Sequence, residues 1–170
     1  MLARNETIFK WALYAGATAV FFLRQGAVLQ RITLWGVIPF VFPILVAVLG
    51  MYEGPLPASV YALTVGVLCD LLLPASIPCF YTLIFPAAGL CAALISQSLL
   101  PAGFLCGVVT SVLSFLLTDA FHCVVLWAGG KAAWAAGAQV FLREVCVSIL
   151  LVVPVVLLFS AVFRRTHLDD

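Results

Sequence analysis

Long apolar runs separated by short polar breaks dominate this chain, and they restrict its fold more than any other feature. Six such runs recur between Thr7 and Phe163, each close to the roughly 20 residues that an α-helix needs to cross a bilayer. Hydrophobic residues make up 65% of the 170 residues and charged residues only 9%, which leaves almost no chain for a soluble domain. The sequence therefore predicts an all-α fold: a polytopic membrane helical bundle forming one domain over residues 1–170.

The predicted spans cover residues 7–23, 34–52, 57–73, 79–99, 102–127 and 145–163. A cleaved signal peptide is the alternative for the first span, with Ala17-Thr18-Ala19 as its small-residue site. These residues lie inside the apolar run rather than after it, which favours a retained helix. The small residues of this helix predict a face for close packing. They are Ala12, Ala15, Gly16 and Ala19.

Prolines and glycines are expected to interrupt the helices within the second predicted span and before the last one. Pro39 and Pro43 lie inside the second predicted span, where each should bend a helix. Gly129-Gly130 ends the fifth span, and residues 131–144 then form a partly amphipathic segment that we expect at the membrane interface.

Six crossings would leave both tails on one side of the membrane. Basic residues near the tails slightly outnumber those in the opposite loops, which favours cytoplasmic tails. The first group is Arg4, Lys10, Arg164 and Arg165, and the second is Arg24, Arg31 and Lys131, with Arg143 ambiguous.

The third span carries one carboxylate, Asp70, with Gly66 one helical turn before it on the same face. A carboxylate facing lipid is costly, about 2.5–3.5 kcal/mol on insertion scales. Asp70 should therefore face other helices, a cavity or a partner, and Gly66 would allow a neighbouring backbone to come close.

The fifth span combines a small-residue pattern with a polar stripe. Gly103 and Gly107 form a small-x-x-x-small pattern typical of helix packing. Farther along, a set of polar residues follows one helical face, namely Ser111, Ser114, Thr118, Asp119 and His122. We expect Asp119 and His122 to bond each other or an adjacent helix inside the bundle.

These residues do not make a pattern typical of a reaction centre. The net charge of +1 comes with no basic patch for nucleic acid, and none of the six cysteines forms a C-x-x-C pair for metal binding. Asp70 and Asp119 could form an aspartyl protease dyad, but no G-x-G-D surrounds either residue. Since nucleophile-elbow and phosphate-loop motifs are absent too, we expect no enzyme activity, cofactor or metal. A membrane scaffold and a small-molecule carrier stay open.

The third span resembles the MreD family of bacterial rod shape-determining proteins. The resemblance is carried by a Gly-Pro turn followed by Gly66-Val-Leu-Cys-Asp70-Leu-Leu, with the chain length, tiny loops and short basic end also similar. It implies a non-enzymatic subunit of the cell-elongation machinery in the bacterial cytoplasmic membrane. The implied partners are an MreC-like protein and, through it, MreB and the peptidoglycan glycosyltransferase and transpeptidase.

The same type of fold resembles the substrate-binding subunits of energy-coupling-factor vitamin transporters, which are the alternative. Those subunits use an Ala-x-x-x-Ala face on the first helix to dock their partner, and Ala15 and Ala19 have that spacing. The short, apolar loops of this chain favour the scaffold.

Overall fold

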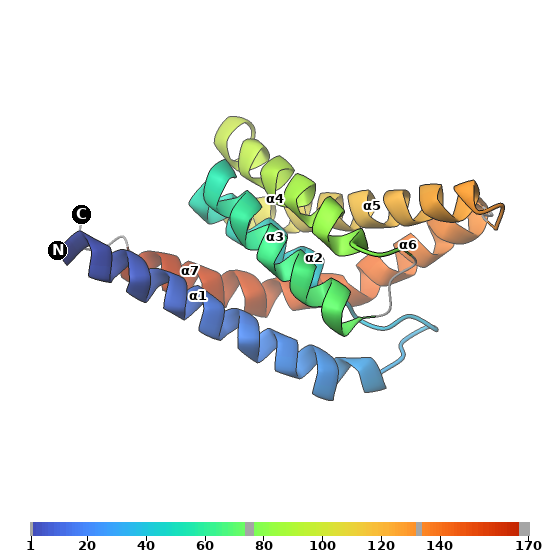
Figure 1. The fold of residues 1–170 in the computed structure, drawn as a ribbon, viewed down its shortest axis with the longest axis horizontal. Coiled ribbons are helices and arrows are strands. Elements are labelled where there is room, and N and C mark those ends of the chain that lie inside the picture. The colour runs from blue at the N-terminus through green and yellow to red at the C-terminus, as the bar shows by residue number, and fades with distance from the viewer. Residues whose placement is uncertain (1, 74–76, 132–133, 167–170) are drawn as a thin grey trace.

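The computed structural model describes residues 2–73, 77–131 and 134–166, and every long element in them is an α-helix (Figure 1). The elements are α1 (Leu2–Ala27), η1 (Leu29–Arg31), α2 (Phe42–Glu53), α3 (Pro55–Leu72), α4 (Phe80–Ser98), α5 (Phe104–Ala128), α6 (Trp134–Ser148), η2 (Ile149–Leu151) and α7 (Val152–Thr166). Five segments are long and apolar enough to cross a membrane. The expectation of an all-helical membrane bundle is thus confirmed at this level.

Three of the predicted spans agree closely with helices. The ranges 57–73, 79–99 and 102–127 match α3, α4 and α5 to within two residues at each end. The start of α1 and the end of α7 lie at the same end of the bundle, and the two helices pack together (Figure 1). The turn that follows α3 includes residues 74–76 and lies partly outside the described residues.

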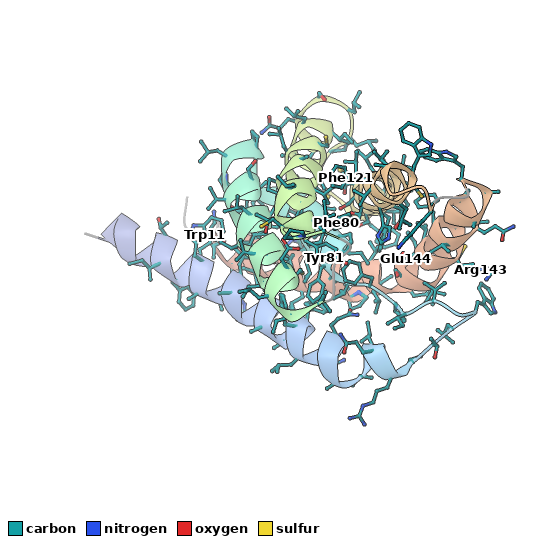
Figure 2. The ribbon with its side chains drawn as sticks, turned by 45° about the vertical axis from the view of Figure 1, so that its right-hand side comes forward. Trp11, Phe80, Tyr81, Phe121, Arg143 and Glu144 are labelled. Atoms are coloured by element: carbon teal, nitrogen blue, oxygen red, sulfur yellow. The ribbon has the colours of Figure 1, made fainter. Side chains whose placement is uncertain are left out.

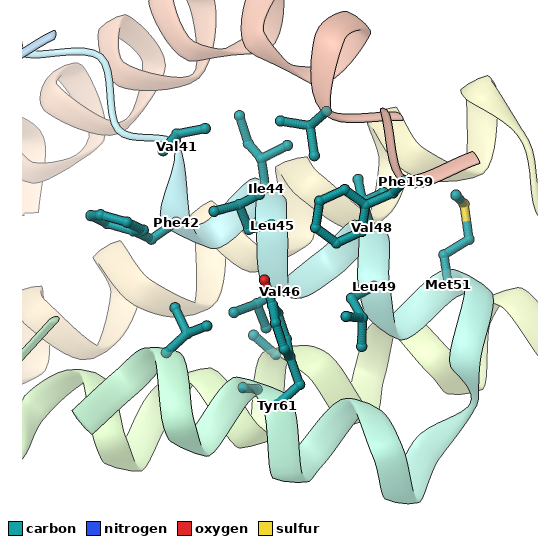
Figure 3. Packing of buried hydrophobic residues seen from close by; sticks show 14 of the residues in the cluster. Val41, Phe42, Ile44, Leu45, Val46, Val48, Leu49, Met51, Tyr61 and Phe159 are labelled. Carbon is teal, nitrogen blue, oxygen red and sulfur yellow. The ribbon is translucent and has the colours of Figure 1, made fainter. Parts of the chain in front are cut away.

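Helix α2 forms the centre of the molecule. All ten residues from Phe42 to Met51 are buried, and the helix contacts α3, α4, α5 and α7. Figure 3 shows its side chains filling the space between Tyr61 of α3 and Phe159 of α7. A helix that is apolar on every side is expected to be enclosed in this way.

The prediction that the second span covers residues 34–52 is wrong in its first part. Residues 32–41 are not helical, and α2 has only 12 residues, or about 18 Å of length. Pro39 precedes the helix and Pro43 lies in its first turn, where a missing N–H leaves no hydrogen bond unmade. Neither proline therefore bends a helix interior, contrary to the expectation.

The start of the last membrane segment also differs from the prediction, which placed it at Val145. Helix α6 begins at Trp134 and continues through η2 into α7, so Trp134–Thr166 is one apolar segment without a break at Val145. The 3₁₀ turn at Ile149–Leu151 has a local cause. Pro154 cannot donate to the carbonyl of Leu150, and its ring crowds that carbonyl, so the α-helical ladder is interrupted just before it.

Small residues let α4 cross the central helix closely. A Cβ atom added to Gly50 of α2 would lie 2.6 Å from the carbonyl oxygen of Gly89 in α4. A Cβ on Gly89 would in turn lie 3.2 Å from the carbonyl oxygen of Ala58 in α3. Glycine at these crossings allows three helices to stack with their backbones nearly in contact.

We predict that Gly50→Ala destabilises the protein, because the new methyl group meets backbone that cannot move aside. Overpacking of this kind costs about 1–3 kcal/mol, which thermal unfolding in detergent would detect. The matched control is Gly26→Ala, since a Cβ there meets nothing within 4 Å. Equal melting temperatures for the two variants would contradict the close crossing of α2 and α4.

Candidate functional site

Asp70 caps the start of a neighbouring helix. Its carboxylate accepts hydrogen bonds from the backbone N–H groups of Tyr81 (3.0 Å) and Thr82 (2.9 Å) and from the Thr82 hydroxyl (2.6 Å). Cys79, the N-cap residue of α4, makes no capping bond of its own. Asp70 therefore satisfies N–H groups that a helix start leaves unpaired, and its negative charge faces the positive end of the α4 dipole.

Gly66 lies against the same turn of α4. A Cβ atom on Gly66 would lie 2.7 Å from the carbonyl oxygen of Tyr81 and 2.8 Å from the Cα of Thr82. The glycine thus brings the α4 backbone within reach of the Asp70 carboxylate one turn later. Gly66 and Asp70 act as one structural unit, which joins α3 to the first turn of α4.

The two glycines of α5 have different surroundings. A Cβ on Gly107 would lie 2.8 Å from Val156 of α7, so this glycine allows close helix packing. Gly103 is the extended N-cap residue of α5, and a Cβ there would meet only the Pro101 carbonyl oxygen at 3.8 Å. The small-x-x-x-small pattern therefore contributes one close helix contact.

Two polar side chains that the sequence did not single out support the non-helical backbone before α2. Gln25 of α1 donates to the Pro39 carbonyl (2.8 Å) and accepts from the Val41 N–H (3.2 Å). The Phe40 N–H donates to the Ser148 hydroxyl of α6 (3.1 Å). Non-helical backbone at membrane depth is stable only when such groups are satisfied.

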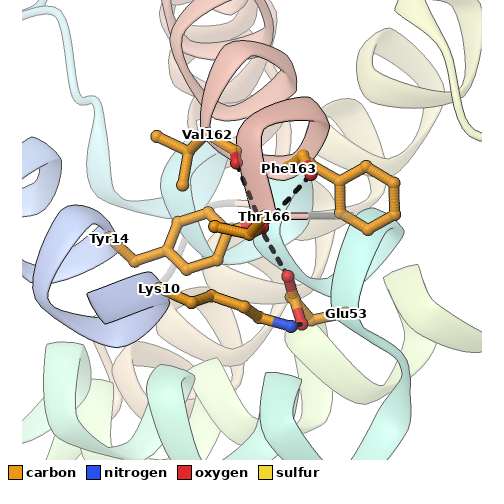
Figure 4. Close-up of polar contacts among 6 residues, drawn as sticks. All are labelled: Lys10, Tyr14, Glu53, Val162, Phe163 and Thr166. Carbon is orange, nitrogen blue, oxygen red and sulfur yellow. Dashed lines mark hydrogen bonds and ion pairs between the residues drawn. The ribbon is translucent and has the colours of Figure 1, made fainter. Parts of the chain in front are cut away.

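A buried carboxylate also lies at the end of the bundle where α1 begins. Glu53 pairs with Lys10 and accepts a hydrogen bond from the Tyr14 hydroxyl (2.8 Å), and its side chain is only 4% exposed (Figure 4). Because all three groups are paired, this cluster joins α1 to the end of α2. In the sequence, Lys10 bears only on the predicted orientation, and no pattern around Glu53 predicts this pairing.

An apolar groove runs between α1 and α3. It encloses about 580 Å³, and its walls include Trp11, Ala15, Ala19, Val60 and Leu68. One hydrogen bond crosses it, between the hydroxyls of Thr18 and Tyr61 (2.6 Å). The small residues predicted to pack closely do not pack within this chain. Ala12, Ala15, Gly16 and Ala19 are all exposed.

A second, more polar cavity of about 930 Å³ lies between the start of α4, the second half of α5, α6 and residues 36–40. Asp119, His122 and Glu144 line it, and Figure 2 shows Glu144 on the same side of the bundle as Phe80 and Tyr81. The His122 ring meets Phe80 edge-on, with centroids 5.5 Å apart. The predicted bond between Asp119 and His122 stays a prediction.

Three buried polar atoms of α5 have no hydrogen-bond partner in the described part of the chain. They are the hydroxyl oxygens of Ser111 and Ser114 and Oδ2 of Asp119. Thr118, on the same stripe, bonds back to the Ser114 carbonyl (2.8 Å). Three residues of this stripe, Thr118, Asp119 and His122, border the polar cavity, whereas Ser111 and Ser114 do not. The predicted stripe therefore divides between the packed core and the cavity wall.

Within the described residues, no group of three or more His, Cys, Asp or Glu side chains is arranged to hold a metal ion. The six cysteines are all unpaired. Comparison with known proteins does not place the chain in a family, since no family model, curated protein or solved structure matches it.

We predict that Asp70→Ala destabilises the protein by about 1.5–3 kcal/mol, the usual cost of losing hydrogen bonds to a charged group. Asp70→Asn keeps one acceptor oxygen and should lose less. Thermal unfolding in detergent measures both, with Ser98→Ala as the control, because that exposed hydroxyl bonds only within its own helix. If Asp70→Ala melts like the control, the carboxylate does not stabilise α4.

Proposed function

We propose that this chain is a non-enzymatic scaffold subunit of the bacterial cell-elongation machinery, similar to MreD. Its proposed partner is the membrane helix of an MreC-like protein, through which it would act with MreB and the peptidoglycan glycosyltransferase and transpeptidase. The proposed location is the cytoplasmic membrane, with six crossings and both tails in the cytoplasm.

The observation that carries this proposal is the exposed small-residue face of α1, which is a docking surface for a partner helix. The carrier would use the same face for its own partner, and the short, apolar loops of the chain favour the scaffold. Ala15 and Ala19 border an apolar groove of about 580 Å³, and a Cβ on Gly16 would meet nothing within 4 Å. In membranes, small residues of this spacing allow a second helix to approach closely. A single apolar helix of a partner protein would match the apolar lining of this groove.

The bonding of Asp70 supports the same proposal. Its carboxylate oxygens accept three hydrogen bonds from the first turn of α4. The residue that carries the family resemblance therefore has a structural role in building the bundle, as a scaffold needs, and its charge is already compensated.

We predict that replacing Ala15 and Ala19 with leucine blocks partner binding without unfolding the protein. The side chains would fill the groove from its wall while leaving the buried core unchanged. Co-purification of the MreC-like partner should fall about tenfold or more, and rod cells that depend on this chain should become round. The measurement is partner recovery from membranes that contain equal amounts of variant and wild type.

The matched control replaces Ala87 of α4 and Ala120 of α5 with leucine. Both alanines are exposed but do not border the groove. Normal co-purification and rod shape with the Ala15/Ala19 variant would reject this docking site. Loss of both with the control variant would show that any bulky change on the surface is disruptive.

The proposed topology predicts that reporter fusions at Gly130 and after Asp170 lie on opposite sides of the membrane. In this proposal the short α2 is counted as a crossing in addition to the five segments that are long enough to span a membrane, which makes the number of crossings even. A reporter active only in the cytoplasm should be active after Asp170 and inactive at Gly130. Activity at both positions would contradict six crossings.

The polar cavity favours the carrier as the second candidate. At about 930 Å³, it has the size of a small-molecule site. Transport of a vitamin together with an energy-coupling module, reconstituted in vesicles, would support the carrier. Partner co-purification with an MreC-like protein would support the scaffold.

A further inference from the structure

The cavity between α4, α5 and α6 has charged groups of both signs at different depths. Asp119 lies about 14 Å from the end of α5, and Glu144 lies about 15 Å from the start of α6. Because α5 and α6 are consecutive and pack together, the two carboxylates lie at about the same distance from the turn that joins these helices. Both are half-buried, whereas Lys131 and Arg143, which line the same cavity, are exposed. The cavity is therefore acidic inside and basic at its rim.

Both carboxylates line this cavity, and no described lysine or arginine forms an ion pair with either. Oδ2 of Asp119 is fully buried and has no hydrogen-bond partner in the described part of the chain. A buried acceptor left in this state costs free energy. A cation in the cavity would not touch this buried oxygen, but it would offset the negative charge that Asp119 and Glu144 bring to the cavity wall.

The walls favour an organic cation over a metal ion. Phe80 and Tyr81 are among the residues that line the cavity, and the faces of aromatic rings attract ammonium groups. An ammonium group can donate up to three hydrogen bonds, enough for both carboxylates. A metal ion would need a larger set of ligands than Asp119 and Glu144 provide.

From this arrangement we infer that the cavity binds a small zwitterion, with its ammonium group at Asp119 and Glu144 and its anionic group at the neighbouring, exposed Arg143. The same chemistry has two sources: a free zwitterion from solution and the headgroup of an aminophospholipid. Both carry an ammonium group a few bonds from an anionic group. The inference concerns the isolated chain and does not depend on the proposed partner at α1.

The test uses the full chain in nanodiscs made only of phosphatidylglycerol, which lacks an ammonium group. Phosphoethanolamine is titrated by calorimetry as the soluble probe, beside ethanolamine and inorganic phosphate separately. In a second arm, native mass spectrometry measures retention of phosphatidylethanolamine against phosphatidylglycerol. We expect the zwitterion to bind at least about tenfold more tightly than either half alone, because each half engages one end of the cavity.

The variants are Asp119→Asn, Glu144→Gln and Arg143→Gln, each of nearly the same shape as the original side chain. Each should weaken binding about tenfold or more, while Arg164→Gln, at the other end of the bundle, should leave it unchanged. Using Glu144→Gln beside Asp119→Asn keeps the test valid if one variant fails to fold. The melting temperature of each variant is measured to check this.

Binding of soluble phosphoethanolamine that depends on Asp119 or Glu144 identifies a free zwitterion. Selective retention of phosphatidylethanolamine alone, with the same dependence, identifies a lipid headgroup. Absence of binding in both arms, or binding unaffected by the carboxylate variants, overturns the inference. None of these outcomes changes the co-purification result at α1, so the two proposals fail separately.

Discussion

Hydrocarbon offers no water to backbone N–H and C=O groups, and the rest of this structure depends on that constraint. At the start of α4 and at both ends of α2, polar side chains from other helices bond the backbone groups that the helical ladder leaves unpaired. Asp70 satisfies the first turn of α4, and Gln25 and Ser148 satisfy the chain before α2. At the other end of α2, the Ser96 hydroxyl donates to the Met51 carbonyl (2.8 Å). The Phe40–Ser148 and Met51–Ser96 bonds join elements that are distant in sequence and the others join consecutive elements, so together they also determine how the helices are arranged.

The two ends of the bundle use charge differently. At the end where α1 begins, Glu53 is fully paired with Lys10 and Tyr14, and the charge stabilises the contact between α1 and α2. Asp119, which lines the cavity formed by α4, α5 and α6, has one buried oxygen without a hydrogen-bond partner among the described residues. A paired buried charge is typical of structure, whereas a buried acceptor without a partner is a local cost in stability of the kind that functional sites carry.

The sequence predicted the parts of this structure that depend on local pattern. The apolar runs predicted α3, α4 and α5 nearly to the residue, because each is bounded by proline, glycine or polar residues. The shared face of Gly66 and Asp70 followed from helical spacing. The start of α2 could not be predicted in this way. Residues 34–41 are as apolar as a helix, and hydropathy measures transfer into lipid, not backbone conformation. The partners that hold this stretch, Gln25 and Ser148, are 14 and 108 residues from the backbone groups they bond.

The separation between Phe40 and Ser148 has a consequence for synthesis of the chain. The N–H of Phe40 gains its partner only after more than 100 further residues have been made. Until then, Gln25, which is made before this stretch, is the side chain available to bond the backbone of Pro39 and Val41. The contact that completes the non-helical segment before α2 therefore becomes available only when α6 has been made and supplies the Ser148 hydroxyl.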